Sequence, residues 1–405
     1  MLPQRTEILK QLAIPAVVSL AIFIFYFVLL GVGSNLAGGW DFQHFVFQAQ
    51  GFAHGQLHYA VLPPTLSDST CVGDRCYWPL APLPGVLLTP LVWLFGLHPF
   101  QAYLTPLLTV ATLLLAWRVA RLERFSSLDA GWLAAGFTFA SIYFGSVGFA
   151  FSWQFASAIG VVLQFSALYE YLTRRRLWLV GILLGLLLAT RATAALLVVP
   201  LALDLLLERT VLWRKRCRSL VALLAPILIA FSLLCWYNQA RFGSPLDSGY
   251  MTARVNPRLV ELRAQYGLFQ LRNVPSNLYY YFIGSVRPLV DYTTYHLKPP
   301  YVRLGYGAGF FWLSPLFLLM FGAQLTTRRR RLLAGGAALT TLVLLTYYSI
   351  NYDEFGPRYL LDALPSYYLL VLWAFPERKL GGRHRWVIVL SAALNLYLLG
   401  SLSIR

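Results

Sequence analysis

Long uncharged apolar runs alternate with short polar segments along almost the whole chain. The first run, residues 12–33, is long enough to cross roughly 30 Å of hydrocarbon at about 1.5 Å per helical residue. It is longer than the apolar core of a cleaved leader, so we interpret it as an uncleaved helix. The pattern predicts an all-α polytopic membrane protein with about eleven transmembrane helices. The later runs lie near residues 101–120, 129–148, 152–172, 177–191, 192–207, 219–237, 305–323, 332–350, 357–375 and 386–403.

Two apolar stretches do not fit a single spanning helix. Residues 177–207 contain Arg191 and Asp204. One long helix there would place Arg191 near the bilayer centre, which costs at least about 2.5–3.5 kcal/mol on insertion scales. We therefore expect a hairpin of two short helices with Arg191 at its outer end. Residues 84–97 follow several prolines and are too short to span, so we expect a juxtamembrane or re-entrant helix.

Composition and charge narrow the class of protein and set its orientation. Of the 405 residues, 58% are hydrophobic and only 12% are charged, with a net charge of +17. Soluble domains are about 25% charged, so this composition excludes a disordered chain, a secreted disulfide scaffold and an ordinary cytosolic enzyme. It also leaves too little solvated basic surface for nucleic acid. The arginine clusters fall in alternate short loops, and the positive-inside rule then places the N-terminus in the cytoplasm and the C-terminus outside.

This orientation gathers the other polar residues on the outer face of a plasma (inner) membrane. The two large outer segments are residues 34–100 and 238–304. No linker separates a second domain, so we expect a single integral membrane domain over residues 1–405. A site for chemistry is therefore expected to face the exterior or periplasm.

The first outer segment contains two closely spaced cysteines, Cys71 and Cys76. An oxidising outer compartment favours a small-loop disulfide between them. Free thiols are one alternative. A metal half-site is the other, and it would need further ligands such as His54 and His58.

A carboxylate and an imidazole stand at the start of the same segment. Apolar side chains recur at helical spacing from residue 42 to residue 52, which predicts an amphipathic helix on the membrane surface. Asp41 and His44 belong to its polar face, about one turn apart. Asp41 either caps this helix or acts as a catalytic or metal-linked carboxylate. Its position where the chain leaves the membrane, in a chain with few acids, favours the second interpretation.

Basic residues on the outer side oppose the usual bias and call for an explanation. Arginine forks bind phosphate oxygens in pairs, so an anionic lipid headgroup is one explanation. Snorkelling or pairing with nearby acids such as Asp353, Glu354 and Asp362 is the other. Tyrosines near residues 279–306 are typical of an interface belt and also fit a sugar platform or a groove for a lipid tail. The outer arginines are Arg191, Arg241, Arg287, Arg303 and Arg358.

Short motifs in a fixed order resemble those of the GT-C superfamily. These membrane glycosyltransferases use polyprenyl-phosphate sugars and include the aminoarabinose transferases and the protein O-mannosyltransferases. The resemblance begins with Asp41 and residues 49–55 (AQGFAHG) and reaches to residue 365. The other matching segments are residues 78–80 (WPL), 84–85 (PG), 190–194 (TRATA), 237–238 (YN), 241–245 (RFGSP), 249–250 (GY), 355–361 (FGPRYLL) and 364–365 (LP).

The resemblance implies a GT-C fold with juxtamembrane helices in the first outer loop. It implies an inverting sugar transfer from a polyprenyl-phosphate donor to an acceptor hydroxyl of a glycan, lipid or protein, with Asp41 as general base. His44 stands where many members carry a second acid, so no cofactor is certain and a divalent metal stays an open question. The candidates for binding the donor phosphate are Arg191, Arg241, Arg303 and Arg358.

Two other functions fit many spans and outer arginines. A polymerase or ligase of lipid-linked glycans would use a polyprenyl-diphosphate donor. A lipid or sugar transporter (flippase) would carry charges in mid-membrane and inverted repeats, whereas the acids here lie near the ends of the predicted spans and no repeat is evident. Nucleotide-dependent chemistry is not indicated, because no P-loop and no GxGxxG motif follows a predicted strand.

Overall fold

The protein is an assembly of short and long helices with two small strand hairpins in its described part. Helix accounts for 70% of the structure. The first predicted span, residues 12–33, lies outside the described residues, as do Asp353 and Glu354. The computed structural model describes residues 39–255, 257–284, 287–290, 297–303, 307–349 and 355–403.

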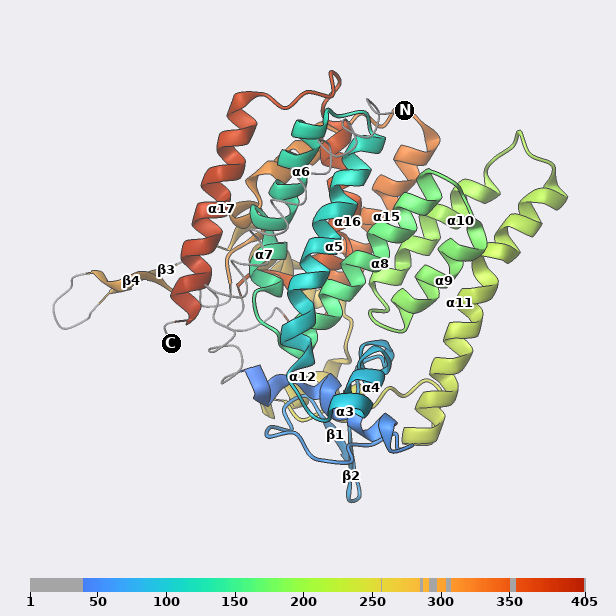
Figure 1. Ribbon diagram of the computed structural model, residues 1–405, viewed down its shortest axis with the longest axis vertical. Coiled ribbons are helices and arrows are strands. Elements are labelled where there is room, and N and C mark those ends of the chain that lie inside the picture. The colour runs from blue at the N-terminus through green and yellow to red at the C-terminus, as the bar shows by residue number, and fades with distance from the viewer. Residues whose placement is uncertain are drawn as a thin grey trace.

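The elements form a helical bundle with a smaller layer at one end (Figure 1). The helices of the bundle are α5 (Phe100–Leu122), α6 (Ser127–Phe139), α7 (Ile142–Val147), α8 (Ser152–Leu172), α9 (Leu177–Leu188), α10 (Val198–Leu206), α11 (Trp213–Phe242), α14 (Phe310–Leu313), α15 (Arg328–Leu345), α16 (Leu364–Trp373) and α17 (Gly382–Ser403). The end layer and the peripheral segments comprise α3 (His44–Ala53), α4 (Leu83–Phe95), α12 (Pro257–Tyr266), α13 (Val274–Leu278), β1 (Thr70–Val72), β2 (Arg75–Tyr77), β3 (Arg287–Val290) and β4 (Leu297–Arg303). The short turns used below are η2 (Trp40–Phe42), η3 (Ala194–Leu197), η7 (Pro315–Gly322) and η8 (Arg358–Asp362).

Three of the described helices are long and apolar enough to cross a membrane, namely α5, α8 and α11. Helix α11 runs along one edge of the bundle (Figure 1). Its apolar side chains remain exposed along much of its length; Leu228 is 62% exposed and Trp236 is 64% exposed. A continuous exposed apolar surface of this kind fits contact with lipid.

Several predicted spans are broken into two shorter helices. The run 129–148 divides into α6 and α7 at Ser141, whose side chain accepts a hydrogen bond from Tyr143 N. The run 305–323 divides into α14 and η7 at Ser314, whose hydroxyl accepts from Ile142 N at 2.9 Å. The buried Asn395 amide of α17 donates to carbonyls at both breaks, those of Phe139, Ser141 and Leu313. Neighbouring side chains thus satisfy the backbone groups that each break releases, as an apolar environment requires.

The basic loops gather at one end of the bundle and are joined there by ion pairs. The stretch 177–207 forms a hairpin. Arg175, just before its first helix, and Glu208, just after its second, form an ion pair at 3.2 Å. Asp204, near the same end of the hairpin, accepts hydrogen bonds from Arg328 at 2.9 Å and from Arg329 at 3.0 Å. These pairs fasten α10 to the start of α15. The arginine-rich loops therefore lie opposite the layer that carries α3 and α4 (Figure 1).

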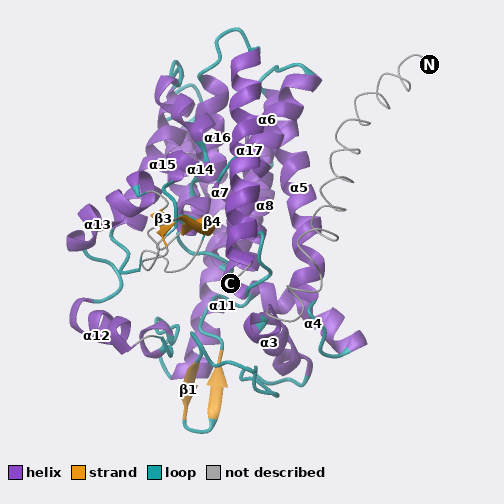
Figure 2. Ribbon diagram, turned by 90° about the vertical axis from the view of Figure 1, so that its left-hand side faces the viewer, coloured by secondary structure: helices purple, strands orange, loops and turns teal. Residues whose placement is uncertain are grey.

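That layer joins the first predicted outer segment to the second (Figure 2). Strands β1 and β2 form a hairpin that is closed by a disulfide between Cys71 and Cys76. Next to it, Arg254 N donates to the Ser69 carbonyl at 2.8 Å and the Thr70 hydroxyl donates to the Gly249 carbonyl at 2.6 Å. These bonds hold the two segments together beneath the bundle.

The interpretation of residues 41–52 as an amphipathic surface helix was wrong. Helix α3 begins at His44, and both its apolar and its polar side chains are buried. Gln48, on the predicted polar face, is 2% exposed and donates to the Tyr237 hydroxyl of α11 at 3.0 Å. Helix α4 covers it closely, since a Cβ at Gly85 would lie 2.3 Å from the Gln48 Oε1 atom. The polar face is therefore used for packing between helices.

Candidate functional site

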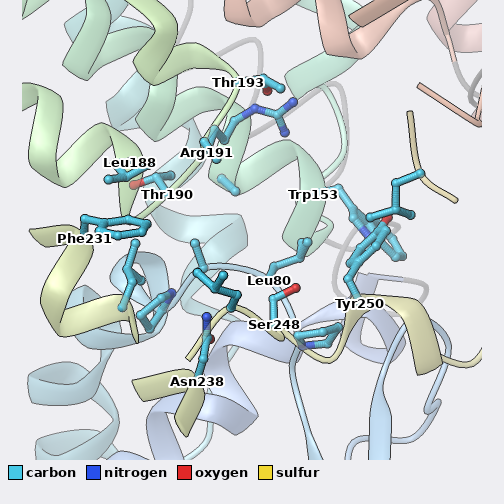
Figure 3. A pocket seen from close by; sticks show the side chains of 18 of the residues that line it. Leu80, Trp153, Leu188, Thr190, Arg191, Thr193, Phe231, Asn238, Ser248 and Tyr250 are labelled. Carbon is cyan, nitrogen blue, oxygen red and sulfur yellow. The ribbon is translucent and has the colours of Figure 1, made fainter. Parts of the chain in front are cut away.

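A cavity of about 400 Å³ lies where the bundle meets the end layer. Its walls come from α8, α11, η8, the turn after α9 and the proline-rich segment before α4. Figure 3 shows Arg191 and Thr193 toward one end of the cavity and Asn238 toward the other, with Trp153 and Tyr250 along one side. The predicted phosphate-binding residues that line this cavity are Arg191, Arg241 and Arg358.

Arg241 lies in the last turn of α11 and is 5% exposed. Its guanidinium stacks on the Tyr237 ring, 3.7 Å from the centroid. Nη1 donates to the Trp78 carbonyl at 2.8 Å and Nη2 donates to Asn238 Oδ1 at 2.9 Å. Both acceptors are neutral, and Nε has no hydrogen-bond partner among the described residues. Arg241 thus brings to the cavity a positive charge that no carboxylate hydrogen bond balances.

Arg191 follows α9 and is held differently, by a carboxylate. Its Nε and Nη2 atoms both donate to Asp362, the latter at 3.0 Å. Nη1 donates to the Ser157 hydroxyl at 3.1 Å. The Thr193 hydroxyl donates to the same carboxylate. Of the two explanations that the sequence left for this arginine, the structure shows the pairing with a nearby acid, Asp362 of η8.

Arg358 begins η8 and lies among aromatic rings. Its guanidinium carbon is 5.8 Å from the Trp153 centroid and 5.4 Å from the Tyr359 centroid. The Tyr359 ring packs against Tyr347 at 4.9 Å, and the Tyr347 hydroxyl donates to the Tyr250 hydroxyl at 2.9 Å. Guanidinium groups are attracted to ring faces within about 6 Å. This aromatic wall holds Arg358 at the cavity with 4% of its surface exposed.

Asp68 is a carboxylate that the sequence reasoning missed. It adopts a left-handed backbone conformation, with φ of 58°, which Asp tolerates better than most residues. Its backbone N–H donates to the Arg254 carbonyl at 2.6 Å. Burial raises the pKa of the Asp68 carboxyl, while the charges of Arg358 and Arg263 act in the opposite direction. A loop position outside any periodic segment carries no signal that would single out this residue.

A second cavity, of about 860 Å³, adjoins the first. The two share Pro82 and Leu234 in their walls. The second cavity is lined by apolar side chains of α3, α4, α9 and α11, among them Trp93 and Trp236. The pair of cavities therefore offers a chamber that contains three arginines next to an apolar groove.

Asp41 lies in η2 as an exposed residue. The N-cap of α3 is Gln43, so Asp41 does not cap this helix. Asp41 is not among the residues that line the cavity. The adjacent Phe42 packs on Trp153, with ring centroids 5.6 Å apart, and Trp153 does line it. The carboxylate is thus one residue removed from a side chain that contacts the cavity wall.

His44 is fully buried and does not itself line the cavity, although its ring centroid lies 6.0 Å from that of the lining residue Trp153. Its ring stacks on Trp78 with centroids 4.2 Å apart, and its Nε2 atom bonds the Thr65 carbonyl at 3.1 Å. Burial lowers the pKa of His44 to about 4. The imidazole is therefore neutral at pH 7, and the structure does not bring it together with the arginines.

Arg303 ends β4, where it pairs with Arg287 of β3. The strand lies beside α17 and not beside the cavity, and the Arg303 side chain lies outside the described part of the structure. Over the residues that the structure describes, no three His, Cys, Asp or Glu side chains cluster in a way that could hold a metal ion.

Comparisons with known proteins identify the fold. No protein-family model matches the chain, and no curated protein matches it. Its structure is similar to that of ArnT from Cupriavidus metallidurans, solved with undecaprenyl phosphate bound, with a TM-score of 0.50 and 13% sequence identity. The similarity covers 95% of this chain and 63% of the ArnT chain, so the protein spans less than two thirds of ArnT. The expectation from the sequence motifs is confirmed at the level of fold: the chain has the fold of a GT-C membrane glycosyltransferase.

Proposed function

We propose that the protein is a membrane glycosyltransferase that uses a polyprenyl-phosphate sugar as donor. The acceptor is a hydroxyl of a glycan, lipid or protein at the outer face of the plasma membrane. The observation that carries this proposal is the arginine-lined cavity adjoining an apolar groove. A lipid phosphate needs both environments, because its headgroup is anionic and its tail is apolar.

The arginines supply the anionic half of the site. Arg241 lines the cavity and its guanidinium donates only to neutral acceptors, so its charge is available to a phosphate. Arg358 lines the same cavity. Guanidinium groups fixed in a buried site stabilise the charge that develops on a departing phosphate without reorganising. A polyprenyl phosphate held in this way is a good leaving group.

The groove supplies the apolar half. Trp93 and Trp236 lie on the exposed edges of α4 and α11, 71% and 64% exposed respectively. A chain entering the groove from the lipid would pass these rings and reach Pro82 and Leu234, where the arginine-lined cavity begins. The fold similarity to ArnT, a structure with undecaprenyl phosphate bound, supports a polyprenyl chain as the occupant.

Asp41 is the proposed general base. Its exposed carboxylate would take the proton of the acceptor hydroxyl as that oxygen attacks the anomeric carbon. The bond between the anomeric carbon and the phosphate oxygen breaks, and the phosphate leaves with the electron pair. Attack opposite the leaving group inverts the anomeric configuration. The support for Asp41 is its place after the first predicted helix, which matches the GT-C motif, and its neighbour Phe42, which packs on the cavity residue Trp153.

The test is transfer by the purified full-length protein in detergent, with labelled polyprenyl-phosphate hexoses and pentoses as donors. We expect Asp41→Asn to lose about 10²-fold or more in turnover while it keeps its thermal stability and its affinity for undecaprenyl phosphate. Asp74→Asn, which removes another exposed outer carboxylate at the tip of the disulfide hairpin, is the matched control. Retained turnover in Asp41→Asn would contradict its role as base. Activity with diphosphate donors alone would indicate a polymerase or ligase, and lipid flux without product would indicate a transporter.

A further inference from the structure

The carboxylate bound by Arg191 is deeply enclosed. The Asp362 side chain is 1% exposed and that of Arg191 is 13% exposed. Nε and Nη2 of the arginine reach both carboxylate oxygens, and the Thr193 hydroxyl adds a third bond. Gly160 of α8 gives the arginine stem its room, because a Cβ there would lie 3.3 Å from Arg191 Cδ. The site is built around the pair.

This pairing changes what Arg191 offers to an anion. Three of its nitrogens already donate to protein acceptors, two of them to a full negative charge. The pair as a unit is close to neutral. A phosphate that approached Arg191 would have to displace Asp362 and leave a buried carboxylate without its partner, which is strongly unfavourable. Arg241, by contrast, has only neutral acceptors.

The same pair fixes the element that carries Arg358. Asp362 and Arg358 are the two ends of η8. The helix is joined to α8 by two links: Gln164 Nε2 donates to the Leu361 carbonyl at 3.2 Å, and Asp362 is tied through Arg191 to Ser157. Without the pair, the Asp362 end of η8 loses its polar link to α8, and the helix that carries Arg358 at its other end is held less firmly.

We propose that Arg191 is a positioning residue: with Asp362 it fixes η8 and so places Arg358, and it does not bind the donor phosphate itself. This inference rests on the proposed function, because it concerns how the phosphate of a polyprenyl donor is held. It divides the three cavity arginines into two that face the ligand and one that supports them.

A double-mutant cycle tests the inference. The variants are Arg191→Met, Asp362→Leu and the combination of both, with Arg241→Met as the matched control. The purified full-length proteins in detergent are titrated with undecaprenyl phosphate, and undecaprenol serves as the probe without phosphate. Thermal unfolding of each variant is measured in parallel, so that a general loss of stability is seen separately from a change in affinity.

The two roles predict opposite outcomes. If Arg191 positions Arg358, each single variant leaves a buried unpaired charge and binds about tenfold or more weakly, whereas the apolar pair restores the packing and binds within about threefold of wild type. The double variant distinguishes the two roles of Arg191 even if a single variant does not fold. If the double variant binds as weakly as Arg241→Met, or Asp362→Leu binds more tightly than wild type, Arg191 is a phosphate ligand and the inference is wrong. If the wild type itself shows no preference for undecaprenyl phosphate over undecaprenol, the proposed function fails first.

Discussion

Replacing Arg241 by methionine is the perturbation that most sharply separates a phosphate site from a packing residue. Methionine keeps an unbranched side chain at this position but removes the guanidinium, whose carbon lies 3.7 Å from the centroid of the Tyr237 ring. It removes the charge, the unused Nε–H and the bonds to the Trp78 carbonyl and to Asn238. The change therefore acts on the cavity with little change in volume.

The expected magnitude follows from the contacts. A hydrogen bond to a charged group is worth about 1.5–3 kcal/mol, and a buried guanidinium can make two of them to one phosphate. A loss of about 3 kcal/mol corresponds to about 100-fold in Kd. We expect this loss in the affinity for undecaprenyl phosphate, measured by titration of the purified protein in detergent, with little change in the affinity for undecaprenol.

Arg254→Met is the control of matched charge, because Arg254 is an exposed arginine of the second outer segment and does not line the cavity. Its affinity for undecaprenyl phosphate should stay within about threefold of wild type. Equal losses in Arg241→Met and Arg254→Met would show that general electrostatic attraction, and not the cavity, determines affinity. No loss in Arg241→Met would refute the assignment of the phosphate to this end of the cavity.

Other parts of the structure make further predictions. His44 is buried and neutral, with a pKa of about 4 against an ordinary value of 6.5. Between these two pH values the unfolded chain binds a proton that the native state excludes. The free energy of unfolding should therefore be full above pH 6.5 and fall by up to about 3 kcal/mol toward pH 4, and it should fall less in His44→Phe. Asn395→Leu should lower the free energy of unfolding by about 2 kcal/mol, because three buried carbonyls lose their hydrogen-bond donor. Leu394→Ala, on the exposed face of α17, should have a smaller effect. Replacing both Cys71 and Cys76 by serine should lower the free energy of unfolding by about 2 kcal/mol in the chain-entropy view and so lower the midpoint temperature of unfolding. A midpoint unchanged from wild type would show that the disulfide has no such role.

The helical segments, and the position of Arg191 between two short helices, could be predicted from the sequence because both depend on local signals. Apolar runs mark helices, and Arg191 could not stay within one long span, so its hairpin followed from desolvation alone. The breaks at Ser141 and Ser314 were not predictable, because they depend on Asn395, which lies more than eighty residues away in the chain. An apolar run predicts that a segment lies in an apolar environment, and it does not show where the helix within it breaks.

The candidate site could be predicted only in part, because some of its contacts join residues that lie far apart in the chain. Three of the four predicted arginines line one cavity. Pairing with Asp362 was one of the explanations for the outer arginines, but the sequence could not tell which arginine it would be, because Arg191 and Asp362 are 171 residues apart. The periodicity of α3 indicated an exposed polar face, and tertiary packing by α4 and α11 buried it, so that Gln48 contacts Tyr237 instead of solvent. Asp68 became visible only when the fold brought its loop beside Arg254. Residues that act through partners far along the chain require the structure.

The position of a bound lipid phosphate is the most direct test of the account. A structure of the full-length protein with undecaprenyl phosphate should show the phosphate within hydrogen-bonding distance of the Arg241 guanidinium, with the prenyl chain in the groove between α4 and α11 and the Arg191–Asp362 pair intact. A phosphate bound among the arginines at the opposite end of the bundle, near Arg328 and Arg329, would contradict the central claim.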